Sequence, residues 1–160
     1  MLVEGLCFLS ANPVDQAADI ETARDMLRGF NTPNGVAVTC AEQIAERARE
    51  LAASMSTTEI TEVFSTTAPR VAGALNQRSD TVIDYFGCGT LPLQEAISIA
   101  VLEAVVHGLD LCNAVGAWPD TLPGAAVEST VVLLAELAPQ FAFIEAATGR
   151  APVDVLPLLH

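Results

Sequence analysis

The sequence predicts an all-α protein. Hydrophobic residues make up 51% of the chain and aromatic residues only 5%. Ala, Leu and Val dominate, and alternating apolar runs bounded by glycine are few. This composition favours helices over sheets. A chain of 160 residues can bury a core of its own but is short for two, so we expect a single domain over residues 1–160.

The first two predicted helices lie before residue 36. Residues 2–11 are strongly apolar and are typical of the end of a buried helix, which Asn12-Pro13 terminates. Ile20, Ala23, Leu27 and Phe30 then recur at helical spacing, and the turn-forming residues 31–35 end that helix. The chain therefore opens within an element.

Two capping-box patterns predict the next two helices. Thr39-Cys-Ala-Glu42 begins an amphipathic helix that runs to about Ala53, and Ser56-Thr-Thr-Glu59 begins one that runs to about Leu75. Pro69 predicts a kink or a break in the second helix. The charged residues of both are most simply a solvated face.

The second half of the chain predicts one short extended segment and three helices. Residues 81–86 are rich in β-prone side chains and precede a glycine-rich turn. Pro92 opens a helix that runs to about Val115 and ends at Gly116. Because residues 96–102 carry no charge, we expect this helix to be the most buried element. Residues 118–123 form a linker to helices over 127–137 and 141–147.

The charge of the chain excludes two classes of partner. With 20 acidic and seven basic residues, the net charge is −13, which repels nucleic acids and anionic membrane surfaces. A signal-peptide pattern and an uncharged stretch of membrane-spanning length are both lacking, so we expect a cytoplasmic protein. Its cysteines are scattered and we expect reduced thiols, although Cys88, between two glycines, could expose its thiol near a site.

Glu103, His107 and Asp110 are the candidate site. A helix places residues four apart on one face, so Glu103 and His107 stack within an otherwise apolar segment. An ionised carboxylate buried there needs a cation or a hydrogen-bond network, and a divalent metal is the best candidate. Asp110 is placed to orient the imidazole. A buried Glu–His pair without metal explains the same spacing, and the spacing does not decide between them.

The wording of this segment resembles a known signature. Leu102-Glu-Ala-Val-Val-His-Gly-Leu-Asp-Leu111, followed by Ala114-Val-Gly116, is similar to the signature of the DinB-like, mycothiol-dependent maleylpyruvate isomerase family. Leu109 stands where that family usually has Trp. Weaker likenesses are Phe86-Gly, Pro92 and the closing Thr148-Gly-Arg-Ala-Pro152.

The resemblance implies a four-helix bundle that holds a divalent metal, usually zinc. Glu103 and His107 would be metal ligands, Asp110 would support His107, and a second His from an earlier helix would complete the site. Register places Met1 at the position of that His, so we expect the bundle to lack the family's first helix. Glu4 or the α-amine could substitute for the missing ligand, whereas His160 lies at a terminus.

The implied chemistry is activation of a thiol cofactor, mycothiol, for isomerisation of an electrophilic small molecule or for S-transfer to it. Two alternatives stay open. One is a non-catalytic helical domain, either a relic or an interaction module, and the other is a metal-dependent hydrolase. The missing helix also predicts an apolar groove along residues 95–115 or 2–9, and hence a homodimer or poor solubility.

Overall fold

The computed structural model describes residues 13–30, 32–75, 80–150 and 152. It is mostly helical, with 69% of the structure in helices, as an all-α fold requires. Its elements in chain order are β1 (Pro13–Val14), α2 (Ala23–Phe30), α3 (Val36–Thr39), α4 (Ala41–Ser54), α5 (Thr57–Leu75), β2 (Val82–Asp84), β3 (Thr90–Pro92), α6 (Leu93–Val115), η1 (Pro119–Thr121), α7 (Gly124–Leu137) and α8 (Gln140–Ala147). The predicted helix at residues 2–11 lies outside the described residues.

The two capping-box predictions have different outcomes. The Ser56–Glu59 box is confirmed, because the Ser56 backbone N–H and hydroxyl both donate to Glu59 and the Glu59 N–H donates to the Ser56 hydroxyl. The Thr39 box is wrong. Thr39 ends the short helix α3, its hydroxyl donates to the Gly35 carbonyl, and Cys40 precedes α4 without a side-chain cap. Pro69 lies within α5, which continues through it.

A small antiparallel sheet surrounds the predicted extended segment. Strand β2 lies between β1 and β3, and it pairs Val14 with Val82 on one side and Ile83 with Leu91 on the other. The turn from β2 to β3 places Phe86 at a φ of 56°, which is unusual for a residue with a side chain. Asp84 accepts a hydrogen bond from the Gly87 N–H across this turn and helps to hold it.

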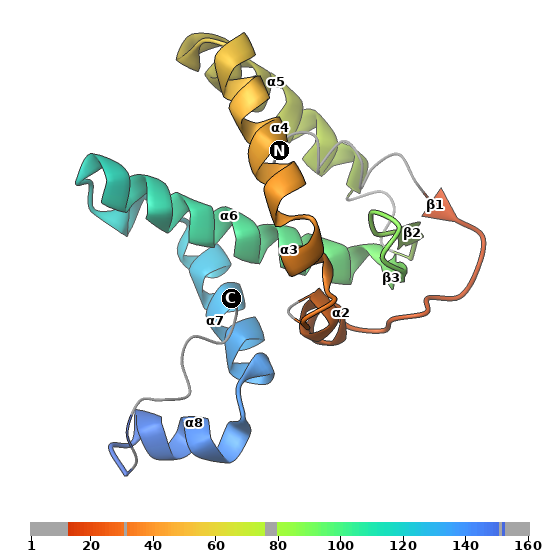
Figure 1. The fold of residues 1–160 in the computed structure, drawn as a ribbon, viewed down its shortest axis with the longest axis vertical. Coiled ribbons are helices and arrows are strands. Elements are labelled where there is room, and N and C mark those ends of the chain that lie inside the picture. The colour runs from red at the N-terminus through yellow and green to blue at the C-terminus, as the bar shows by residue number, and fades with distance from the viewer. Residues whose placement is uncertain (1–12, 31, 76–79, 151, 153–160) are drawn as a thin grey trace.

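Helix α6 is the centre of the core, as its uncharged segment predicted. Figure 1 shows it running across the middle of the molecule. Five of its residues are buried, namely Leu93, Ala96, Ile99, Leu102 and Val105. Four of these form one cluster with residues from α2, α5, α7 and the sheet. Burial of large aliphatic side chains of this kind stabilises a fold by about 1.5–3 kcal/mol each.

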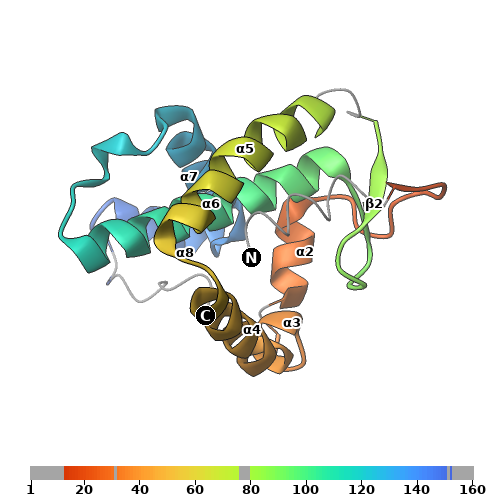
Figure 2. The same cartoon turned by 90° about the horizontal axis from the view of Figure 1, so that it is seen from above.

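Two helices stand apart from this core. Neither α4 nor α8 contains a buried residue, and Figure 2 shows α4 well separated from α5 when the molecule is seen from above. Helix α5 is divided. Its C-terminal half buries Thr67, Val71 and Leu75, whereas Ile60 and Phe64 on its N-terminal half are exposed. Among the described helices, none is long and apolar enough to cross a membrane.

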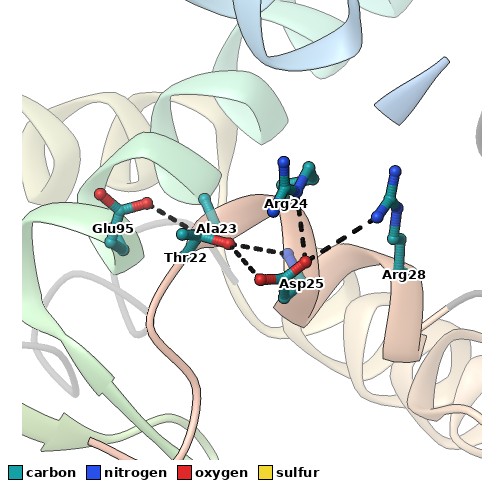
Figure 3. A network of polar contacts seen from close by, with 6 residues as sticks. All are labelled: Thr22, Ala23, Arg24, Asp25, Arg28 and Glu95. Atoms are coloured by element: carbon teal, nitrogen blue, oxygen red, sulfur yellow. Dashed lines mark hydrogen bonds and ion pairs between the residues drawn. The ribbon is translucent and has the colours of Figure 1, made fainter. Parts of the chain in front are cut away.

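A carboxylate from α6 fixes the start of α2 (Figure 3). Glu95 accepts a hydrogen bond of 2.7 Å from the Ala23 backbone N–H, across 72 residues of chain. Within α2, the Asp25 N–H donates to the Thr22 hydroxyl, which in turn donates to the Asp25 carboxylate. Negative groups at a helix N-terminus satisfy unpaired N–H groups and complement the helix dipole. Glu95 therefore links the two helices by a charge-assisted contact.

Replacement of Glu95 by Ala should lower the free energy of unfolding by about 1–2 kcal/mol, because the Ala23 N–H loses a charged acceptor. Urea denaturation followed by circular dichroism measures the loss. Glu95→Gln keeps an uncharged acceptor and should lose less. Gln94→Ala, at the exposed neighbouring position, is the matched control, and an equal loss in Q94A and E95A would contradict the assigned contact.

Candidate metal site on helix α6

The three candidate residues lie together on the C-terminal half of α6. The Nε2 atom of His107 is 3.4 Å from Oε2 of Glu103, and the Nδ1 atom of His107 is 3.3 Å from Oδ2 of Asp110. The helix brings them together because they are four and three residues apart. The predicted proximity is therefore present, with one carboxylate at each ring nitrogen.

The predicted burial of this pair is wrong. The side chains of Glu103 and His107 are each 49% exposed, and that of Asp110 is 69% exposed. The buried residues of α6 recur at steps of three from Leu93 to Val105, and each step falls about 60° short of a full turn. The buried stripe thus rotates around the helix, away from the face that carries Glu103 and His107.

Asp110 sets the chemistry that His107 can offer. In the neutral imidazole, an Nδ1–H that donates to Asp110 leaves the Nε2 lone pair directed toward Glu103. A carboxylate partner on the non-ligating nitrogen is the usual arrangement of a metal-binding His. In the protonated imidazole the same contacts are two ion pairs, and exposed pairs of this kind contribute only about 0.2–0.5 kcal/mol each.

The ligand set for a catalytic zinc centre is incomplete in the described part of the chain. Such a centre uses three protein ligands and one open position. No group of three or more His, Cys, Asp or Glu side chains among the described residues could hold one metal ion. The substitutes considered from the sequence, Met1 or Glu4, and the terminal His160 all lie outside those residues. The residues that are described fit a two-ligand site and not the three-ligand centre of the family.

Tyr85 is a neighbour of the site that the sequence did not indicate. It is buried at the end of β2, and burial raises the pKa of its hydroxyl far above the usual value, with the charge of Glu103 as the next largest cause. The hydroxyl therefore stays protonated near that carboxylate. Within residues 81–86 Tyr85 was one of several β-prone residues, and no spacing pattern connected it to Glu103.

Cys88 lies in the turn between β2 and β3, where the sequence placed it, but it is partly buried. Burial raises the pKa of its thiol, and the nearby Cys40 and Asp84 raise it further. A thiol with a raised pKa is a poor nucleophile at neutral pH, because the thiolate is the reactive form. An activated thiol at this position is therefore not supported.

The comparisons with known proteins do not extend the assignment. No protein-family model matches the sequence, and no curated protein or solved structure shows significant similarity to it. The likeness to the DinB-like, mycothiol-dependent family rests on the quoted residues alone and stays a prediction.

Alkylation of Cys88 should reach half of its maximal rate at a higher pH in the folded protein than in urea, because folding raises the pKa of the thiol. Iodoacetamide labelling over a pH series, with mass spectrometry of the Cys88 peptide, measures both midpoints. The unfolded chain is the internal reference. Coincident midpoints would contradict the buried position of the thiol.

Proposed function

We propose that this protein binds a divalent metal ion, with zinc the best fit, through Glu103 and His107 on α6. The distance between their ligand atoms, 3.4 Å from Nε2 to Oε2, carries the proposal. Zinc bonds to imidazole nitrogen and carboxylate oxygen are about 2.0–2.2 Å long, so neighbouring ligand atoms around a tetrahedral ion lie about 3.4 Å apart. The pair thus already has the spacing that two adjacent zinc ligands need.

Asp110 supports this function as a positioning residue. Its contact with Nδ1 at 3.3 Å favours the tautomer whose Nε2 is free to bind metal. Loss of a carboxylate partner of this kind typically weakens metal affinity by about 10–100-fold. The exposure of all three side chains also leaves an open path for the ion from solvent.

The reaction chemistry implied by the family is a further part of the proposal. A bound zinc ion would lower the pKa of a thiol such as mycothiol, or of water. The thiol route corresponds to isomerisation or S-transfer with an electrophilic substrate, and the water route to hydrolysis. Since the described residues provide two ligands and not three, we assign no residue of this chain to a reaction step.

A second candidate function is that of a non-catalytic helical interaction module. The exposure of many large apolar side chains favours it. They lie on α4 and α5, on the C-terminal half of α6, and on α7 and α8, and include Ile44, Phe64, Leu111, Val115, Val131, Phe141 and Ile144. Surfaces of this extent on soluble proteins usually bind other molecules. The four-helix bundle of the family would need further apolar cover of the same kind.

Zinc at 100 times its dissociation constant should stabilise the protein by about 2.7 kcal/mol, because it binds only the folded site. Urea denaturation with and without zinc, and after chelation, measures this gain. Glu103→Ala and His107→Ala should abolish it, and Asp110→Asn should reduce it.

His160→Ala is the matched control, because His107 and His160 are the two histidines of the chain. The H160A variant should keep the full gain. A zinc effect that survives in H107A, or that disappears in H160A, would contradict a site at Glu103 and His107.

A further inference from the structure

We infer that two copies of this chain share one zinc ion, each contributing its Glu103–His107 pair. This inference rests on the proposed function and adds the partner that completes the site. Two ligands come from one copy, and a tetrahedral structural zinc site takes four. A two-fold axis through the ion would supply the other two from the same residues of the second copy, because an isologous contact presents identical groups from both sides.

Exposure makes this pairing sterically accessible. The ligand atoms of Glu103 and His107 face solvent, with about half of each side chain exposed. The helix continues beyond them with apolar side chains that the described residues leave uncovered, since Leu111 is 68% and Val115 is 75% exposed. Leu111 lies one turn after His107, on the same side of α6. Trp118, just past the helix, is 78% exposed.

The charges explain why the contact requires metal. Residues 80–149 contain nine acidic residues and no Lys or Arg, so two copies that meet along α6 repel each other. A Zn²⁺ ion between two Glu103 carboxylates cancels their charges at the point of closest approach. The apolar side chains beyond His107 can then pack against the second copy. Metal and association are therefore coupled, and neither is favourable alone.

This arrangement also explains why a helical protein would keep an acid and an imidazole at this spacing on an open surface. A single exposed Glu–His pair holds zinc weakly, because most of the coordination sphere remains water. Four protein ligands close the sphere and give a structural site. The resulting site has no open position for a thiol or for an activated water, so it favours assembly over catalysis.

Analytical ultracentrifugation of the full chain with zinc, and separately with EDTA, tests the inference together with zinc analysis of each species. A dimer that forms with zinc, dissociates in EDTA and contains one zinc per two chains supports it. His107→Ala should abolish zinc-dependent dimerisation. Leu111→Asp, at an exposed position, should weaken it by at least about tenfold, and Glu128→Ala on α7 should leave it unchanged.

The outcomes separate the two proposals. A monomer that retains one zinc per chain through His107 leaves the proposed function standing and overturns the shared site. Failure to retain zinc in any form overturns both. A dimer that persists in EDTA, or that forms with zinc in H107A, also overturns the shared site. Circular dichroism of each variant verifies that its helices are intact.

Discussion

The burial of one rotating apolar stripe on α6 organises this protein. Because its buried residues follow one another at intervals of three, from Leu93 to Val105, successive parts of the helix present different sides to the core. One helix can therefore contact α2 and the sheet near its start and α7 further along. The same rotation leaves the side that carries Glu103 and His107 facing solvent.

Contacts between distant parts of the sequence complete this arrangement. The Glu95 carboxylate reaches the first turn of α2, and Thr90 at the start of β3 donates to Asp19 and accepts from the Asp19 N–H. The segment before α2 is therefore held against the segment before α6. Polar contacts set the position of α2, and burial of Met26 and Leu27 provides most of the energy.

Local signals predicted the elements well where one residue type decides the structure. Gly116 ends α6 in the left-handed conformation, with a φ of 66°, and Ser56–Glu59 caps α5. The Thr39 pattern failed because the backbone there closes a separate short helix, and its hydroxyl reaches back to Gly35. Strands β1 and β3 were missed because each has only two or three residues, and their pairing is set by tertiary contacts.

For the candidate site, spacing predicted proximity but not environment. Helical geometry alone brings His107 next to Glu103 and Asp110, so their contacts could be read from the sequence. Exposure depends on which neighbour covers each side of α6, and a run of apolar letters does not contain that information. Tyr85 lies near Glu103 for the same reason, through folding of the sheet and not through any local motif.

The position of α4 has a consequence for how the molecule breathes. A helix of 14 residues without a single buried side chain gains little from tertiary packing, and isolated helices of this length are marginal in water. Its amide protons should therefore exchange through local fraying, long before the whole chain opens. Proteases would find this segment first, and the centre around α6 would outlast the cut. In the intact molecule α4 is thus the element whose order depends most on what surrounds it.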